Sequence, residues 1–134
     1  MANLLKLSEA TALALHTMVI IGKQETPISA SPMAEQLCAS EAHIFKVLQQ
    51  LVRAGLLRSK RGPHGGYVLA RSAGEITLMD VYEVFEGPMR KDGCLFDKLA
   101  CSRLDCILGD LVEDVRMKVV DHFTATTLRQ AGNN

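Results

Sequence analysis

The sequence predicts a mainly α-helical protein with one small β-hairpin, and three observations lead to this fold class. Apolar residues recur with the 3.6-residue period of an α-helix, most clearly between Ser40 and Gly55. Leucine, valine and alanine are abundant, whereas aromatic residues make up only 4% of the chain and tryptophan is absent. A glycine-rich stretch at residues 60–66 separates two short apolar runs, which is the pattern of a hairpin turn.

Size and composition indicate one globular domain. The chain has 134 residues, of which 48% are hydrophobic and 22% are charged, so it can bury a core and is not of the disordered class. Residues 10–22 are apolar but too few to span a bilayer, and Glu9 and His16 do not suit a signal peptide. We therefore expect a cytoplasmic protein that binds no membrane. An enzyme is not expected, because no nucleophile–base pair or phosphate loop is recognisable.

Two helices are predicted before residue 40. The first covers residues 7–22 and is apolar on most sides. The second is short and covers residues 33–38, because Ser31 followed by Pro32 has the pattern of an N-cap and a first helical proline. A tight turn follows, and Ser40 is the predicted N-cap of the next helix.

The helix predicted between Ser40 and Gly55 has the clearest pattern in the chain. Its apolar face consists of Ile44, Val47, Leu48, Leu51 and Val52. Its opposite face is polar and partly basic, and carries Glu41, His43, Lys46, Gln49, Gln50 and Arg53. Two helices joined by a tight turn, with the second one polar outside, predict a helix-turn-helix unit.

Two short strands are predicted on either side of the glycine-rich stretch, at residues 56–59 and 67–70. The glycines between them permit positive φ angles and let the backbone approach a phosphate or a groove. Arg61 at the tip would suit a minor groove. A hairpin directly after a helix-turn-helix unit is the wing of a winged helix, and an ordinary solvated loop is the alternative.

Charge is distributed unevenly, although the net charge is zero. Residues 42–74 contain no acid and six basic residues, which are Lys46, Arg53, Arg58, Lys60, Arg61 and Arg71. The rest of the chain holds nine basic and fifteen acidic residues. A basic block in an otherwise acidic protein indicates binding of a polyanion, and a solvated basic surface is the alternative.

A fourth helix is predicted over residues 78–86, because Thr77 and Asp80 have the spacing of a capping box and Gly87 can end the helix. A last, long helix is predicted from Ser102 to about Leu128. Its apolar stripe is too long for a small core and predicts a dimer interface; the stripe comprises Leu108, Leu111, Val112, Val115, Val119 and His122 or Phe123.

The chain therefore divides into three predicted parts. A winged helix-turn-helix domain covers residues 1–87, a cysteine-bearing loop covers 88–101, and a dimerisation helix with a tail covers 102–134. A two-fold dimer would place two equivalent helices on successive major grooves of double-stranded DNA with a palindromic operator.

Three of the four cysteines fall within thirteen residues, with the spacing C-x6-C-x4-C; they are Cys94, Cys101 and Cys106. A closed tetrahedral zinc or iron–sulfur site has four protein ligands, so one ligand is missing from this set. Cys101 and Cys106 would stand at the N′ and N4 positions of the last helix, where two side chains normally pack together as a hydrophobic staple. Two small buried thiols are therefore the alternative to a metal or redox role. A helix N-terminus stabilises thiolates, which favours that role. Cys38 stands apart and is expected to be a buried core thiol.

The run from Leu51 to Leu69, with its R-G-x-x-G-G-Y wing, resembles the signature of the bacterial winged-helix regulators related to IscR and NsrR. The order of the elements matches over nearly the whole chain. The resemblance implies a homodimeric transcription factor, a repressor or dual regulator, whose iron–sulfur cluster (2Fe–2S or 4Fe–4S) alters operator binding. Members of this family respond to iron–sulfur supply, nitric oxide, redox state or other signals. Such clusters decay in air, so aerobic preparation can leave the protein without one.

The ligand positions depart from the family pattern. Family members commonly have C-x5-C-x5-C or a close variant, and the middle cysteine is shifted by one here. The histidine that IscR-like members place three residues after the last cysteine is Gly109, and the first-helix acid of NsrR-like members aligns with Ala12. His16 matches the first-helix histidine of some relatives and is the candidate fourth ligand. A packed core histidine, an exchangeable non-protein ligand and an open iron site are the alternatives.

The predicted DNA-binding residues lie in the caps, the third helix and the hairpin; they are Ser31, Ser40, His43, Lys46, Arg58, Lys60, Arg61 and His64. The caps and hairpin residues would meet phosphates or the minor groove and set the register. His43 and Lys46 would reach base edges, with Glu41 and Gln49 as helpers.

Two other functional hypotheses stay open. In the first, DNA binding is switched by oxidation of two of the three cysteines to a disulfide, without a cluster. In the second, the protein carries a cluster and uses its winged fold for protein contacts, without a DNA function. Either hypothesis keeps the cysteines as the chemically active part of the chain.

Overall fold

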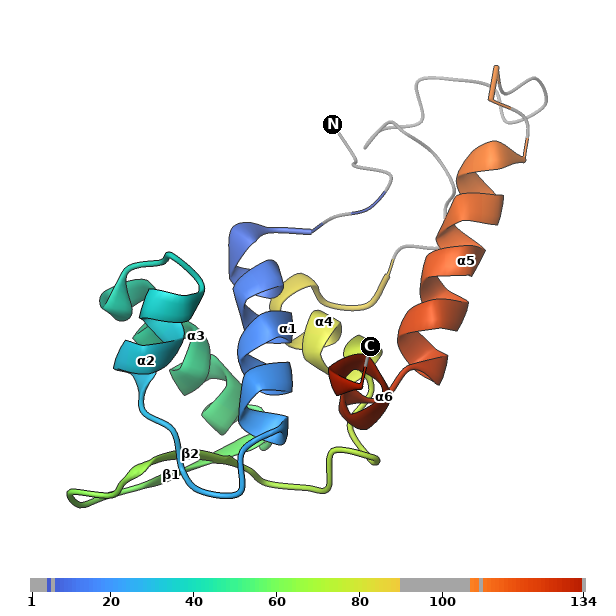
Figure 1. The fold of residues 1–134 in the computed structure, drawn as a ribbon. Helices are drawn as coiled ribbons and strands as arrows, with labels where there is room; N and C mark the ends of the chain where they lie inside the picture. Colours follow the sequence, from blue (N-terminus) through green and yellow to red (C-terminus); the bar gives the residue numbers. More distant parts are fainter. Residues whose placement is uncertain (1–4, 6, 90–106, 109, 134) are drawn as a thin grey trace.

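The computed structural model describes residues 5, 7–89, 107–108 and 110–133 of the chain. This part contains six helices and one two-stranded antiparallel sheet (Figure 1), which confirms the predicted fold class. In chain order the elements are α1 (Glu9–Gly22), α2 (Ala30–Gln36), α3 (Glu41–Arg53), β1 (Leu57–Lys60), β2 (Gly66–Leu69), α4 (Leu78–Glu86), α5 (Leu111–Ala125) and α6 (Leu128–Gly132).

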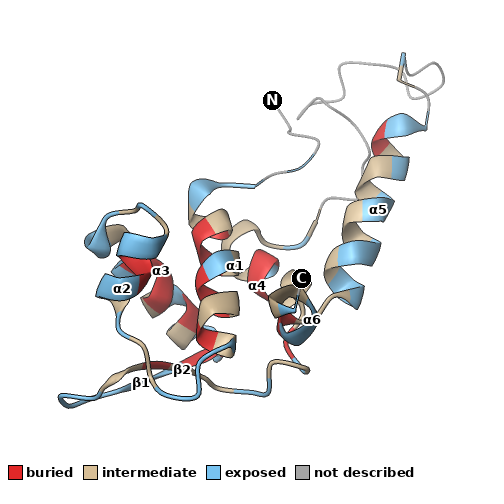
Figure 2. Ribbon diagram, in the orientation of Figure 1, coloured by how far each residue is buried: buried red, intermediate tan, exposed pale blue. Residues whose placement is uncertain are grey.

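Helix α1 forms the centre of the molecule. It lies between the α2–α3 pair on one side and α4 with α6 on the other (Figure 1). Its buried side chains, among them Met18 and Ile21, meet those of α3 and α4 in one continuous core (Figure 2). The helix begins two residues later than predicted, because the Ser8 hydroxyl accepts from the Thr11 amide at 3.2 Å and so acts as the N-cap.

The helix-turn-helix unit is present, but its first helix starts earlier than predicted. Ser29 is the N-cap of α2, so Ser31 lies inside the first turn and is not a cap. The prediction failed because Pro32 is tolerated at any of the first helical positions, whose N–H groups have no partner within the helix. Ser40 does cap α3, as predicted, by accepting from the His43 amide at 3.1 Å.

The turn between α2 and α3 has an unusual residue at its centre. Cys38 has a φ of 52°, and the amides of Cys38 and Ala39 donate to the carbonyls of Glu35 and Ala34, which closes α2 as a Schellman motif. Glycine is the usual residue there. The Cys38 side chain is exposed, so the expectation of a buried core thiol is wrong.

The predicted hairpin is confirmed, with each strand displaced by one residue or less at its ends. Leu57 pairs with Leu69 and Lys60 with Gly66. The segment before α2 adds a third partner, because Ile28 and Tyr67 exchange backbone hydrogen bonds of 3.3 and 2.8 Å. A Cβ at Gly66 would lie 2.5 Å from the Ile28 backbone, so this close approach requires glycine.

The C-terminal region differs most from the prediction. The capping box of Thr77 and Asp80 is confirmed at the start of α4. The long predicted helix is wrong in its bounds: residues 107 and 108 form a turn, α5 begins at Leu111, and the helix ends at Ala125. The predicted cap of Ser102 and Asp105 lies outside the described residues.

A short helix, α6, follows α5 and returns to the core. A second capping box, formed by Thr127 and Gln130, begins this helix. The Leu128 side chain is buried, and its amide donates to the Ile76 carbonyl at 2.9 Å. None of the helices in the described residues is both long enough and apolar enough to cross a membrane.

Candidate nucleic-acid interface

Helix α3 is amphipathic and presents a polar face to solvent. Its apolar side chains Ile44, Val47, Leu48 and Leu51 are almost completely buried. The exposed residues are Glu41, Ala42, Phe45, Lys46, Gln50 and Arg53, and His43 is half-buried. In a helix-turn-helix unit the second helix is the one that enters a major groove, so this face is the candidate base-reading surface.

One hydrogen bond joins this face to the hairpin. The Gln49 side-chain amide donates to the Tyr67 hydroxyl at 3.1 Å, and Tyr67 is only 7% exposed. Because Tyr67 belongs to β2, the bond holds α3 and the hairpin in one relative orientation. Gln49 was predicted as a helper in base contact, and the structure gives its amide nitrogen an internal partner.

The hairpin forms a basic arm that lies along one end of the molecule (Figure 1). Arg58, Lys60, Arg61 and His64 are all exposed, and none of them forms an ion pair with a described residue. The turn is closed by a 2.9 Å bond from the Gly65 amide to the Gly62 carbonyl. A Cβ at Gly65 would lie 2.2 Å from the Lys60 carbonyl oxygen, so the tight turn requires glycine at this position.

The eight predicted DNA-binding residues are all described. Ser31 and Ser40 are exposed on the helix-turn-helix unit, His43 and Lys46 belong to α3, and the other four belong to the hairpin. The prediction omitted Phe45, whose side chain is 52% exposed on α3. The exposure of Phe45 could have been predicted from the apolar periodicity, because Phe45 falls outside the stripe of α3 that faces the core.

His16, the candidate fourth metal ligand, is exposed on α1, so a packed core histidine is excluded. Its Nδ1 atom lies 2.7 Å from the Ala12 carbonyl oxygen. A carbonyl oxygen only accepts, so Nδ1 is the donor of this bond, and in the neutral imidazole Nε2 then has the free lone pair. His16 also borders an apolar groove of about 440 Å³ that is lined by residues of α1, the end of α2, α4, α5 and α6.

The cysteines Cys94, Cys101 and Cys106 lie outside the described residues. Within the part of the chain that is described, no three His, Cys, Asp or Glu side chains come close enough to hold a metal ion. Cys38 is the one cysteine in that part, and its thiol is free.

The elements on either side of the cysteine segment meet in a small polar and aromatic junction. Glu86, at the end of α4, accepts from the Ser8 amide at 2.9 Å and from the Thr11 hydroxyl at 2.6 Å. Tyr82 packs edge-to-face against Phe123 of α5, with ring centroids 5.7 Å apart. Burial, and then the nearby Glu86 carboxylate, raise the pKa of Tyr82 above its ordinary value.

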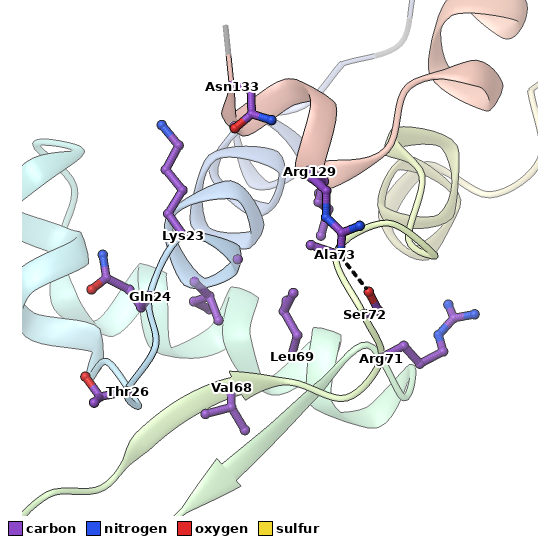
Figure 3. A pocket seen from close by; sticks show the side chains of 14 residues that line it. Lys23, Gln24, Thr26, Val68, Leu69, Arg71, Ser72, Ala73, Arg129 and Asn133 are labelled. Carbon is purple, nitrogen blue, oxygen red and sulfur yellow. Dashed lines mark hydrogen bonds between the residues drawn. The ribbon is translucent and has the colours of Figure 1, made fainter.

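A cavity of about 620 Å³ lies at the root of the hairpin, between α1, β2 and α6 (Figure 3). Arg129 of α6 donates to the Ser72 hydroxyl at 3.1 Å across it. Lys23 and Arg71 also border the cavity, but their side chains point away from each other (Figure 3). The hydrogen bond therefore attaches α6 to the segment that follows the hairpin.

Comparison with known proteins agrees with this architecture. The profile of the Rrf2 family, described as "Iron-dependent Transcriptional regulator", matches residues 7–134. BadM of Rhodopseudomonas palustris is 35% identical over 92% of this chain and 81% of its own length. CymR of Bacillus subtilis is 33% identical over 92% of this chain and 89% of its own length. The match to a candidate HTH-type transcriptional regulator of Aquifex aeolicus spans 65% of that protein, at 31% identity over 67% of this chain.

Three solved structures are closely similar in fold. CymR of B. subtilis, described as the global cysteine regulator, has a TM-score of 0.79 at 28% identity, covering 96% of this chain and 97% of that one. The oxidized form of CymR from Staphylococcus aureus has a TM-score of 0.77 at 26% identity, covering 97% and 98%. IscR of T. potens has a TM-score of 0.73 at 26% identity, covering 95% and 85%.

Proposed function

The chain belongs to the Rrf2 family, and from this premise we propose that it is a homodimeric, DNA-binding transcriptional repressor that senses redox, nitric oxide or iron–sulfur status through its clustered cysteines. One observation carries the DNA-binding part. The exposed polar face of α3 and the basic hairpin belong to one packed unit, because α3 and the hairpin share the hydrophobic core and Gln49 bonds to Tyr67. A polyanion that follows this unit meets base-reading side chains and phosphate-binding side chains together.

The roles of the individual residues follow from their exposure and chemistry. Lys60 and Arg61 at the hairpin tip bind phosphates or enter the minor groove, and Arg58 with His64 adds positive charge beside them. Lys46 is free to reach a base edge or a phosphate from α3. His43 is half-buried, so only one edge of its ring is available to a base.

The dimer is supported by apolar side chains on α5. Leu111 is 55% exposed and Met117 is 42% exposed, although the helix is amphipathic and already packs against α4. Large exposed apolar side chains on a helix at the edge of the molecule are typical of an interface with a second copy. Two copies joined through α5 would present two α3 helices to a palindromic operator.

An iron–sulfur cluster is the cofactor that the donor set fits best. Three thiolates from Cys94, Cys101 and Cys106 and one imidazole are soft and borderline ligands of the kind that such clusters use. His16 is exposed, and the bond from Nδ1 to Ala12 leaves Nε2 available and fixes the tautomer, as the second hydrogen bond of a metal-ligating histidine does. When bound, a 2Fe–2S or 4Fe–4S cluster would supply the centre that reacts with oxidants or nitric oxide.

Anaerobic purification tests the sensing part. We expect brown protein with stoichiometric iron and sulfide, an operator affinity that differs between the cluster-bound and cluster-free forms at fixed salt, and a changed spectrum in His16→Ala. Equal affinities of the two forms would contradict cluster sensing and leave DNA binding intact. An unchanged His16→Ala spectrum would remove His16 from the ligand set.

A thiol switch is the second candidate, and the likeness to CymR favours it. One of the similar structures is described as an oxidized form, and another as a cysteine regulator. In this case the protein is colourless and free of metal, and its operator affinity changes with the thiol–disulfide ratio. Cys94, Cys101 and Cys106 are each replaced by serine in turn. The two replacements that remove a member of the disulfide pair would abolish the dependence of operator affinity on the thiol–disulfide ratio, and the third would not.

A further inference from the structure

Phe45 is the one large apolar side chain on the outer face of α3. Its side chain is 52% exposed, whereas Ile44 and Leu48 on the same helix are completely buried. The core beneath α3 is therefore complete without the phenyl ring. The ring is therefore available to a partner, and its burial by that partner would be favourable.

The neighbours of Phe45 define the kind of partner that would cover it. At helical spacing, Phe45 lies one turn after Ala42 and one turn before Gln49, so these three residues share one face of α3. Ala42 is also exposed, and its methyl side chain can make only apolar contacts. Gln49 is bound to Tyr67, so the face is turned toward the hairpin. Lys46 and Arg53 place positive charge beside this strip.

An apolar strip edged by cations suits one feature of DNA. The thymine methyl group is the apolar group that base edges present in the major groove, and phenylalanine and alanine are side chains that contact it. Cytosine has only a hydrogen atom at C5, where thymine has its methyl group, and an amino donor at the neighbouring C4, which a phenyl ring would leave without an acceptor. A protein partner would need a larger apolar patch than one ring with two cations beside it.

We propose that Phe45 is a specificity-determining residue that packs against the C5-methyl group of one thymine in each half of the operator. This inference rests on the proposed DNA-binding function and adds to it the identity of a base. Ala42, one turn earlier, extends the same apolar contact toward the start of α3. The preferred half-site accordingly contains a thymine where the second turn of α3 meets the groove.

The test removes the thymine methyl group from the DNA and the phenyl ring from the protein in separate experiments. Preferred sites are first selected from random duplex DNA with the full-length protein, and each thymine of the half-site is then replaced by deoxyuridine. At one position we expect deoxyuridine to weaken binding of the wild-type protein about fourfold per half-site, the factor that burial of one methyl group gives. Phe45→Ala should bind the thymine and uracil sites equally, and Phe45→Leu should retain part of the preference.

Three outcomes separate the possibilities. Equal sensitivity of wild type and Phe45→Ala to deoxyuridine, or no thymine position with an effect, overturns the assignment of Phe45. Failure of the wild-type protein to select any DNA sequence overturns the proposed function itself. Unfolding curves of Phe45→Ala and Phe45→Leu serve as the control, and both variants should remain fully folded at the temperature of the binding assay because Phe45 lies outside the core cluster.

Discussion

The side-chain amide of Gln49 donates a hydrogen bond of 3.1 Å to the hydroxyl of Tyr67, and this bond connects the outer face of α3 to the hairpin. The two residues are separated by 18 positions in the chain. Tyr67 is in turn paired through its backbone with Ile28, so the segment before α2 belongs to the same unit. These contacts add to the hydrophobic core shared by Leu51 of α3 and Leu57 of β1, and together they fix the relative orientation of α3 and the hairpin.

Tyr67→Phe should lower the free energy of unfolding by about 1 kcal/mol, the net contribution of one hydrogen bond. Operator affinity should also fall, because α3 and the hairpin lose one of the contacts that fix their orientation. Denaturant unfolding and a binding titration measure the two effects. Gln49→Ala is the matched variant, and the double variant should lose less stability than the sum of the two single substitutions. Strictly additive losses would mean that the hydrogen bond contributes no coupling between Gln49 and Tyr67.

Replacement of Lys60 or Arg61 by alanine should weaken binding to all DNA sequences by a similar factor. Each loss of a phosphate contact should reduce the slope of log affinity against log salt by about 1. Titrations at several salt concentrations give the slope. Lys118→Ala, on the exposed side of α5, removes the same charge far from the hairpin and should leave the slope unchanged.

Met117→Glu should convert the dimer into monomers, because a carboxylate at this position would have to lose its water against the partner's apolar surface. Light scattering at several protein concentrations measures the mass. Met117→Leu keeps the apolar contact and should remain dimeric. A dimeric Met117→Glu protein with normal unfolding would show that α5 does not form the interface at this position.

Cys38→Gly should raise the free energy of unfolding by about 0.5 kcal/mol. A left-handed φ costs an L-residue about 1–2 kcal/mol, and the greater freedom of glycine in the unfolded chain offsets part of that gain. Cys38→Val should lower stability instead, because a β-branched side chain is strained at a φ of 52°. Both variants are compared with the wild type under reducing conditions. The opposite order would mean that the thiol makes a stabilising contact.

Local patterns were sufficient for the elements that are stabilised by near neighbours. The apolar stripe of α3, the Ser40 cap and the capping box of Thr77 and Asp80 each depend on residues three or four apart. The hairpin was predictable for the same reason, since its glycines act within a few residues. The DNA-binding candidates in the hairpin followed directly, because side chains at such a tip are exposed in any fold.

Other features depended on contacts between distant segments. The α5 helix ends because Thr126 and Leu128 bind the backbone at Leu78 and Ile76, about fifty residues away, so a continuous helix to Leu128 is replaced by a bend and a short helix. Cys38 and His16 lie in apolar-looking segments, yet both are exposed: Cys38 stands in the turn after α2, and α1 turns other faces than that of His16 to the core.

The sequence by itself therefore determined the class of the fold, the helix-turn-helix unit with its hairpin, and the concentration of basic residues on that unit. The tertiary structure decided how much of each helical side chain remains in contact with solvent. It left Phe45 exposed on α3, because Ile44 and Leu48 fill the space beneath the helix. Periodicity indicates which face of a helix is apolar, but only packing against the other elements decides how wide the buried stripe is.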